Sequence, residues 1–158
     1  MKSSQNFERT EKIIAQNRKA RHDFEIIQSI EAGIVLQGTE VKSLRTGKCS
    51  MQDSYAAFTQ KDSLELSLLN LHISPYDHGN RENHEAKRPR RLLLTFRELK
   101  KLKTSVSEKG ITLIPLSVYF SGPFVKVEIG LARSKRKYDK RESTKERETE
   151  REIRRKYK

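Results

Sequence analysis

Apolar and polar residues alternate along several short segments of the chain, which is the pattern of strands with one buried face. The alternation is clearest over Leu64–Leu68 and over Val125–Leu131. Strand-like segments lie at 24–36, 53–58, 64–73, 91–94, 111–120 and 124–132, and most are joined to the next by polar turns. About six strands in this order predict one antiparallel sheet.

Three positions interrupt the strand pattern. Gly33 lies inside the first segment, where it predicts a bend, and the alternation slips at Leu69, where it predicts a bulge. Pro115 lies inside a strand segment, so that strand must lie at an edge or contain a bulge.

Two segments carry helix signals instead. Thr39 to Thr46 reads as a short helix with Thr39 as N-cap and Gly47 just past its end. Thr95 and Glu98 form a capping-box pair, and an apolar stripe follows before the stop at Lys109-Gly110. That stripe consists of Leu99, Leu102 and Val106.

These elements predict a mainly β fold with short helices. A small chain hides its strand edges most simply by closing the sheet, so we expect a closed antiparallel barrel of about six strands, like the oligonucleotide-binding fold. A half-open sheet with helices on one face is the alternative. The expected organisation is a flexible leader over 1–16, the barrel over 17–132 and a basic tail over 133–158.

The tail differs from the rest of the chain in composition. Arg133 to Lys158 holds 13 Lys or Arg residues against 6 Asp or Glu, and little apolar bulk. Without an apolar stripe we expect it to be disordered when free. It is nevertheless built from good helix formers, and Glu150–Arg154 and Glu152–Lys156 are favourable i,i+4 pairs. We therefore expect a helix that forms only on a polyanion.

The formal net charge of +13 makes a nucleic acid the expected partner. The longest aliphatic runs are of the size of Leu92–Leu94, far short of a membrane span, and the first residues contain no secretory signal. Cys49 is the only cysteine, which fits a reducing cytoplasm. These features favour a cytoplasmic RNA-binding protein with no membrane partner.

Three basic groups are candidates for phosphate contacts, which supply affinity and salt dependence rather than sequence readout. They are Asn17, Arg18, Lys19 and Arg21; Lys42, Arg45 and Lys48; and Lys87, Arg88, Arg90 and Arg91. The residues that could stack on bases are Tyr55, Phe58, Tyr76, Tyr119 and Phe120, although those on strands fit a core equally well. Glu31 could support a neighbouring arginine or accept hydrogen bonds from a base edge, and Glu40 favours the start of its helix.

An enzyme is the weaker reading of the sequence. His72, His78 and His84 are spaced by six residues, which matches no zinc-ligand pattern. A metal-dependent nuclease centred on the loop from His78 to Glu85 is the enzyme alternative. The chain has no glycine-rich phosphate loop and no nucleophile motif, and we expect no cofactor and no metal.

Several segments resemble one known family. They are NRKARHDF (17–24), EAGIVLQGTEVKSLRTGK (31–48), DSYAAF (53–58), RRLLL (90–94), KVEIGLA (126–132) and YDKRE (138–142). In this order and spacing they are similar to the bacterial tmRNA-binding family, also called SsrA-binding protein or small protein B. The resemblance spans roughly residues 15–142. Ser134-Lys135-Arg136 departs from the usual Gly-Lys-Lys of the family, and Cys49-Ser50-Met51 departs from its usual residues too.

The resemblance implies an oligonucleotide-binding-like barrel and an adaptor without enzyme activity. Such an adaptor binds the tRNA-like domain of tmRNA, supports its aminoacylation and delivers it to stalled 70S ribosomes, with ribosomal RNA as a second partner. The expected tmRNA determinants are Asn17, Glu31, Leu92, Leu93 and Lys126. We expect a monomer that does not bind DNA. A general ribosome-associated RNA-binding protein without tmRNA specificity is the alternative.

The resemblance also suggests a specific role for the tail. We expect it to thread the mRNA channel of a stalled ribosome as a helix. The residues expected at the decoding end are Lys135, Arg136, Tyr138, Asp139, Lys140 and Arg141, with Tyr138 stacking on a base. Ile153, Arg154 and Tyr157 would act further along the channel.

Overall fold

The computed structural model describes residues 11–78, 83–135 and 137–156. The first half of the chain forms β1 (Glu11–Gln16), α1 (Arg18–Asp23), β2 (Phe24–Ile34), α2 (Gly38–Arg45), β3 (Cys49–Ser50), β4 (Tyr55–Phe58), β5 (Leu66–Leu69) and β6 (His72–Ile73). The second half forms β7 (Arg90–Leu93), α3 (Phe96–Val106), β8 (Ile111–Ser121), β9 (Phe124–Ser134) and α4 (Lys137–Lys156).

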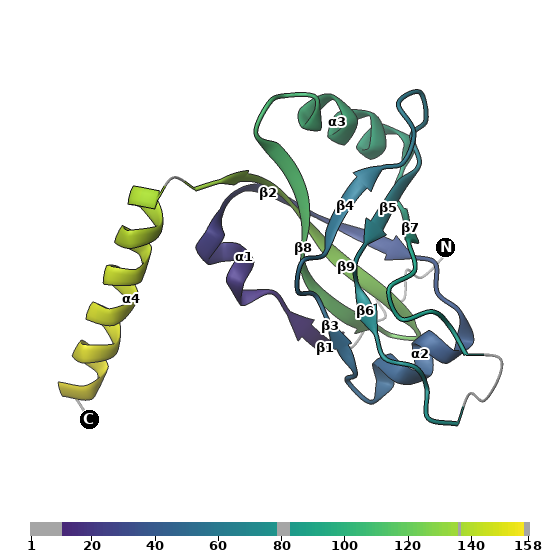
Figure 1. Cartoon of the computed structure of the whole chain (residues 1–158), viewed down its shortest axis with the longest axis horizontal. Coiled ribbons are helices and arrows are strands. Elements are labelled where there is room, and N and C mark those ends of the chain that lie inside the picture. The colour runs from purple at the N-terminus through teal and green to yellow at the C-terminus, as the bar shows by residue number, and fades with distance from the viewer. Residues whose placement is uncertain (1–10, 79–82, 136, 157–158) are drawn as a thin grey trace, which may run out of the picture.

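Six of these strands close into a ring. Within the described ranges the main sheet has the order β1-β8-β4-β5-β7-β2-β9, and an additional pairing of β9 with β8 closes the six strands from β8 to β9 into the ring. All of these pairs are antiparallel. β1 lies outside the ring, on the edge of β8, and β3 pairs with β6 in a separate small sheet. The strands cross at steep angles around a common interior (Figure 1).

Bulges allow the long strands to curve around this ring. The register shifts between Pro115 and Ser117 where β8 pairs with β9, and between Ile26 and Gln28 where β2 pairs with β9. A bulge tolerates a residue without a backbone N–H, so of the two alternatives predicted for Pro115, an edge position or a bulge, the structure shows the bulge. β2 continues past Gly33, whose missing side chain leaves room for Leu93, because a Cβ there would lie 3.3 Å from the Leu93 Cβ. Gly33 is therefore a point where β7 approaches β2 closely.

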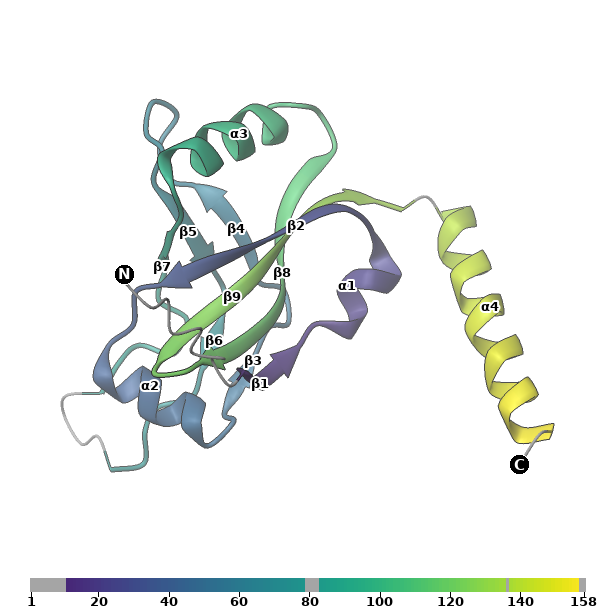
Figure 2. The ribbon, with the colours of Figure 1, turned by 180° about the vertical axis from the view of Figure 1, so that it is seen from behind.

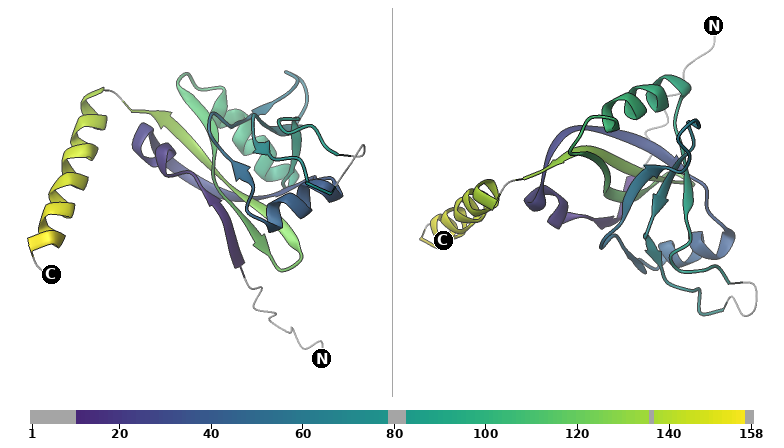
Figure 3. Two further views of the ribbon diagram at one scale, coloured as in Figure 1. Left: turned by 60° about the horizontal axis from the view of Figure 1, so that its bottom comes forward. Right: turned by 45° about the horizontal axis from the view of Figure 1, so that its top comes forward.

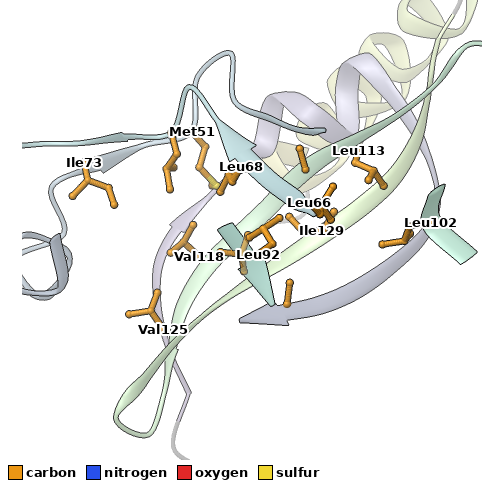
Figure 4. Close-up of a cluster of buried hydrophobic side chains, with 14 of the residues drawn as sticks. Met51, Leu66, Leu68, Ile73, Leu92, Leu102, Leu113, Val118, Val125 and Ile129 are labelled. Carbon is orange, nitrogen blue, oxygen red and sulfur yellow. The ribbon is translucent and has the colours of Figure 1, made fainter. Parts of the chain in front are cut away.

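The core fills the ring interior. Alternate residues of the ring strands point inward, and Leu66, Leu68, Val118 and Ile129 are all fully buried (Figure 4). Val127 is fully buried too. A second, smaller cluster lies where α1 packs on the strands, and consists of Ala20, Ile114, Leu116 and Ala132. Burial of apolar surface in these two clusters supplies most of the stability of the fold.

Helices α2 and α3 lie at opposite ends of the ring, and α1 lies on its side (Figures 1 and 2). In α3, Thr95 Oγ1 accepts from the Glu98 N–H at 3.3 Å, and Glu98 accepts from the Thr95 N–H at 3.0 Å, so the predicted capping box is confirmed. The N-cap of α2 is Gln37 rather than Thr39, because Glu40 accepts from the Gln37 N–H at 2.8 Å. The sequence analysis missed α1, which Asn17 caps through its side chain.

Helix α4 extends away from the ring, and only its first part lies near α1 (Figure 3). Its described side chains, from Lys145 on, are exposed. Lys137–Lys156 form this helix, which good helix formers and i,i+4 pairs favour. That the tail is disordered when free of RNA stays a prediction. No helix in the described ranges is long and apolar enough for a membrane span.

The predicted leader also needs a correction. Residues 11–16 belong to β1 and pair with β8, for example Ile13 with Tyr119 and Gln16 with Ser117. The open edge of β8 provides backbone partners that the leader's own sequence does not reveal. Residues 1–10 lie outside the described part of the chain.

Candidate RNA interface

One row of side chains crosses the outer face of the sheet. The backbone register places Leu93 opposite Gly33, Gly33 opposite Lys126, Lys126 opposite Tyr119, and Tyr119 opposite Ile13. We call these five residues, from β7, β2, β9, β8 and β1, the outer row. Leu93 is 52% exposed and Ile13 is 57% exposed, so the row combines apolar contact surface with the ammonium group of Lys126.

Glu31 lies beside the outer row and accepts a hydrogen bond from the Tyr119 hydroxyl. Burial, together with this carboxylate, raises the pKa of Tyr119, so the phenol remains a hydrogen-bond donor. In the same register Glu31 faces Glu128, which accepts from the Ser117 hydroxyl at 3.2 Å. Among the described residues Glu31 makes no ion pair, which argues against its support of an arginine. Because its side chain is exposed, it retains oxygen lone pairs for a base edge.

Helix α1 presents a basic surface next to this face. Its residues Arg18, Lys19 and Arg21 are exposed, and Arg18 and Arg21 line a pocket of about 360 Å³ with Tyr119 and Glu128. Asn17 holds the helix in place, because its Oδ1 accepts from the Ala20 N–H at 3.2 Å and its amide donates to the Pro115 carbonyl at 2.9 Å. Both ends of the Asn17 amide are therefore used inside the protein.

Helix α2 supplies the second basic group. Lys42, Arg45 and Lys48 are all exposed. The Lys42 ammonium lies 5.5 Å from the centre of the Tyr76 ring, and Lys48 Nζ lies 2.8 Å from an Asp77 carboxylate oxygen. Exposed contacts of this kind are weak, so phosphates can displace them.

A buried ion cluster anchors α2 beneath this surface. Glu40 is fully buried and accepts hydrogen bonds from Arg88 and Arg90. Arg90 also donates to the Leu71 carbonyl at 2.6 Å and to the Ala86 carbonyl at 3.0 Å. Burial alone would raise the pKa of Glu40, but hydrogen bonds from Arg88, the Gln37 backbone and Arg90 hold it below its usual range.

Two residues of the predicted RNA-binding set are therefore corrected. Arg90 and Leu92 are 0% and 2% exposed, so neither can contact RNA. Strand β7 alternates, and these two side chains point into the protein, toward Glu40 and the core respectively. Arg91 and Leu93 point outward and remain candidates. In the third basic group, Lys87 is exposed, whereas Arg88 is half-buried against Glu40.

The structure also removes the main feature of the nuclease alternative. His84 is buried, with Nδ1 at 2.9 Å from the Thr39 hydroxyl and Nε2 at 2.9 Å from the Ile73 carbonyl. Both ring nitrogens are used inside the protein, so His84 is no metal ligand. In the ranges that the structure describes, no three His, Cys, Asp or Glu residues are grouped to hold a metal. Burial raises the pKa of the Cys49 thiol to about 11, which keeps it protonated.

The junction with the tail is attached to α1. The Lys135 N–H donates to the Asp23 carbonyl at 3.0 Å, and Lys135 Nζ donates to the Arg21 carbonyl at 3.1 Å. Ile153, 51% exposed, and Arg154 lie on the surface of α4. Arg136 and Tyr157, and the side chains of Tyr138, Asp139, Lys140 and Arg141, lie outside the described residues.

Comparison with known proteins decides the family. A family model described as SmpB protein matches residues 14–158. The chain belongs to the SmpB family. It is 54% identical to the SsrA-binding protein of Carboxydothermus hydrogenoformans, over 90% of this chain and 94% of that one. It is 52% identical to the SsrA-binding protein of Geobacillus thermodenitrificans, over 91% of each chain.

A solved structure agrees with this assignment. It is described as "tmRNA-SmpB: a journey to the center of the bacterial ribosome", and one of its chains matches with a TM-score of 0.66 and 47% identity. The match covers 82% of this chain and 93% of that chain. The family resemblance found in the sequence is thereby confirmed.

The backbone conformation at Ser134 explains why serine can replace the glycine that is usual in the family. Ser134 is the last residue of β9 and pairs with Phe24 of β2. An extended, paired backbone accepts any residue except proline, so glycine is not required there. For Cys49-Ser50-Met51 nothing in the structure indicates a consequence.

The sequence analysis missed one charged surface. It predicted α3 from its buried stripe and capping box but did not consider the opposite side of that helix. Phe96, Arg97, Lys100 and Lys101 are all exposed there. The signal was available in FRELKKLK, where basic residues recur at i and i+4.

Proposed function

We propose that this protein is an RNA-binding adaptor of trans-translation. It binds the tRNA-like domain of tmRNA, supports its aminoacylation and delivers it to stalled 70S ribosomes in the cytoplasm. It acts as a monomer and without catalysis of its own. Membership of the SmpB family supports this function, as does the similarity to a chain described with tmRNA and the bacterial ribosome.

The single observation that carries the proposal is the outer row with its flanking charges. Exposed Leu93 and Ile13 offer apolar contact to bases and riboses, and Lys126 offers a phosphate contact between them. Glu31, oriented by Tyr119, can accept from a base amino group. The tRNA-like domain lies on this face in our proposal, because it is a folded RNA that exposes loop bases.

The exposed cations around the row supply the remaining affinity. They are Arg18, Lys19 and Arg21 of α1; Lys42, Arg45 and Lys48 at α2; and Arg91 of β7. Each phosphate that they neutralise releases counterions, so binding weakens steeply with salt. Asn17 acts indirectly, by holding α1 in position.

We further propose that the six-stranded ring is an oligonucleotide-binding-type barrel. Its closed antiparallel order supports this, as does the position of α3 between β7 and β8. Helix α4 is then the part that enters the ribosome, where residues 135–141 act at the decoding end and Ile153 and Arg154 further along the mRNA channel. The exposure of its described side chains leaves them free for RNA.

A binding assay tests the tmRNA-binding step. Leu93→Ala and Lys126→Ala should each lower the affinity for a transcript of the tRNA-like domain by about tenfold, the scale of one or two contacts. Ile27→Ala is the matched control, since Ile27 is 49% exposed on β2 outside the outer row, and should change the affinity less than twofold. Equal losses in all three variants would contradict the proposed face.

A competition assay separates the alternative function. The adaptor prefers the tRNA-like transcript to bulk duplex RNA at the same ionic strength, whereas a general ribosome-associated protein binds both alike. Removal of Lys137–Lys158 then tests the tail: tmRNA binding should survive and peptide tagging on stalled ribosomes should be lost. Continued tagging would contradict the role proposed for α4.

A further inference from the structure

A row of polar side chains runs beside the outer row on the same face of the sheet. The backbone register places its four residues directly across from one another: Gln16 of β1, Ser117 of β8, Glu128 of β9 and Glu31 of β2. Residues two positions apart on a strand point to the same face, so Ser117 lies next to Tyr119 of the outer row. We call these four residues the polar row. It provides a line of hydrogen-bonding groups beside the apolar contact surface.

Three residues of the polar row line a pocket between the sheet and α1. Helix α1 follows β1 directly and lies beside β8 (Figure 2). The pocket has a volume of about 360 Å³, with Gln16, Ser117 and Glu128 on its sheet side and Arg18 and Arg21 on its helix side. A volume of this size suits a small ligand such as a single nucleotide.

Glu128 is oriented in this pocket but keeps most of its capacity to accept hydrogen bonds. The Ser117 hydroxyl donates to Oε2 of Glu128 at 3.2 Å, and among the described residues this is the only hydrogen bond to the carboxylate. Ser117 itself is buried, which fixes the position of its hydroxyl. Because an ionised carboxylate has about four lone-pair sites, both oxygens of Glu128 can still accept from a ligand.

The pairing of Glu128 with Glu31 is unfavourable for the sheet by itself. Two like charges directly opposite each other on neighbouring strands repel. No salt bridge between described residues involves either carboxylate, and none involves Arg18 or Arg21, which lie close by. Local rules of this kind are broken chiefly at functional sites. Unpaired carboxylates inside the pocket and unpaired guanidinium groups at its side therefore indicate a ligand that carries both hydrogen-bond donors and negative charge.

Among the nucleobases, guanine matches this arrangement. Two adjacent acceptor oxygens need two adjacent donors, and guanine presents N1–H and its N2 amino group side by side. Adenine and cytosine place an acceptor beside their amino group, and uracil places its single N3–H between two carbonyls. A carboxylate thus pairs through both oxygens with the base-pairing edge of guanine alone. The guanidinium groups of Arg18 and Arg21 suit the phosphate of the same nucleotide.

We propose that the pocket between the polar row and α1 binds an unpaired guanine nucleotide, and that Glu128 is the residue that selects guanine. Ser117 orients Glu128, and Glu31 accepts the second hydrogen of the guanine amino group. Arg18 and Arg21 bind the phosphate. In the proposed function, on which the assignment to a partner rests, this guanosine belongs to a loop of the tRNA-like domain.

Mononucleotides test the pocket without an RNA partner. In NMR titrations of the full chain, 5′-GMP should shift the backbone N–H signals of Ser117 and Glu128. It should bind about tenfold more tightly than 5′-AMP, which is the scale of one bidentate contact to a base. 5′-IMP keeps N1–H but lacks the amino group, so its affinity should lie between the two. Equal affinities for the three nucleotides, or no shifts at these two residues, would overturn the proposal.

Variants of the pocket separate base selection from phosphate binding. Glu128→Gln keeps the size of the side chain but replaces an acceptor oxygen with a donor amide, so the preference for GMP over AMP should disappear. Glu25→Gln is the matched control, since Glu25 is exposed on β2 outside the pocket, and should keep the preference. Arg18→Gln/Arg21→Gln should weaken GMP and AMP alike. A preference that persists in Glu128→Gln would show that Glu128 does not select the base.

Thermal unfolding distinguishes this role from a structural one. Glu128→Gln removes the like-charge pair with Glu31, so the variant should unfold at the same temperature as the wild type or at a higher one. A lower unfolding temperature together with an unchanged preference for GMP would make Glu128 a structural residue and overturn the proposal.

A transcript of the tRNA-like domain keeps this proposal apart from the proposed function. Glu128→Gln should lower the affinity for the transcript about tenfold, and inosine at the recognised guanosine should weaken the wild type but not the variant. If the wild type prefers GMP but fails to bind the transcript, the tmRNA adaptor falls and the guanine pocket stands. If it binds the transcript but does not distinguish GMP from AMP, the adaptor stands and the pocket falls.

Discussion

Strand β7 and helix α4 are both rich in arginine, yet they use it in opposite ways. In β7, Arg90 is fully buried against Glu40 while its neighbour Arg91 is exposed. In α4 every described charged side chain is exposed, and the only large apolar one, Ile153, is 51% exposed. Strand β7 has a buried side, whereas the described side chains of α4, from Lys145 on, have none.

This difference shows that a charged side chain stabilises the fold when it is buried and hydrogen-bonded, as Arg90 is. Arg90 fixes the chain around it because its guanidinium reaches Glu40 and the carbonyls of Leu71 and Ala86 in a site without water competition. The charges on α4 from Lys145 on are exposed to water, so their pairs contribute little to stability and remain available to RNA. The buried cluster and the exposed helix should therefore respond very differently to the same substitutions.

The largest expected effect is the loss of the buried pair. Glu40→Ala leaves Arg90 charged and buried without its carboxylate, which should lower the free energy of unfolding by about 3–5 kcal/mol. Urea denaturation of the full chain measures this. Glu150→Ala on α4 is the control and should cost no more than about 0.5 kcal/mol. Similar costs for both would show that burial does not distinguish the two regions.

The two leucines of β7 have the same side chain, but Leu92 is buried and Leu93 is exposed, so the same substitution can be compared in both environments. Leu92→Ala removes core contacts and should cost about 2–5 kcal/mol, because it leaves a cavity in the ring interior. Leu93→Ala removes the same atoms from an exposed site, and should change stability by about 0.5 kcal/mol or less while it weakens RNA binding. Chemical denaturation and RNA titration of both variants test this. The opposite order of stabilities would contradict the inward and outward assignment.

The pH dependence of the free energy of unfolding should be smaller than the effects of these core substitutions and larger than those on α4. The pKa of Glu40 is lower in the folded protein than in the unfolded chain, so its contribution is fully present above about pH 4.5. It is lost as the pH falls through the folded-state pKa, with a slope of at most about 1.4 kcal/mol per pH unit. Urea midpoints from pH 7 to pH 3 measure this slope. Glu40→Gln cannot titrate there, and an unchanged slope in that variant would assign the effect to other carboxylates.

The smallest effect belongs to α4. Glu150→Gln with Glu152→Gln removes two i,i+4 pairs, each worth about 0.2–0.5 kcal/mol, and should slightly lower the circular dichroism signal at helical wavelengths. Glu146→Gln is the matched control, because residues 149 and 150 carry no positive charge. Addition of a polyanion should raise the helical signal of the full chain more than that of a chain without Lys137–Lys158. An equal response would contradict the expectation that α4 gains order on RNA.

Local patterns predicted much of this fold correctly. The alternation in Val125–Leu131, the capping box of Thr95 and Glu98, and the bulge at Pro115 were all visible in the sequence. Each depends on residues within one turn of helix or a few positions of strand, so the chain itself carries the signal. The family resemblance identified the outer-row positions Leu93 and Lys126 for the same reason, since short motifs contain them.

The candidate site was predicted less well where distant segments meet. Arg90 and Arg91 are adjacent and chemically identical, so the sequence predicted that both contact phosphates. Only the pairing of β7 within the ring decides that Arg90 points inward, to a glutamate 50 residues away. His84 is similar, because its partner Thr39 lies 45 residues earlier.

The sequence by itself thus determined the six strands of the ring, where α3 begins, and that the chain carries an excess of positive charge. The tertiary structure decided which of those charges RNA can reach. It also paired β2 with β9 and β1 with β8, which created the outer row. The physical reason is burial: a side chain's solvent exposure depends on neighbours brought together by ring closure, and no stretch of adjacent residues records them.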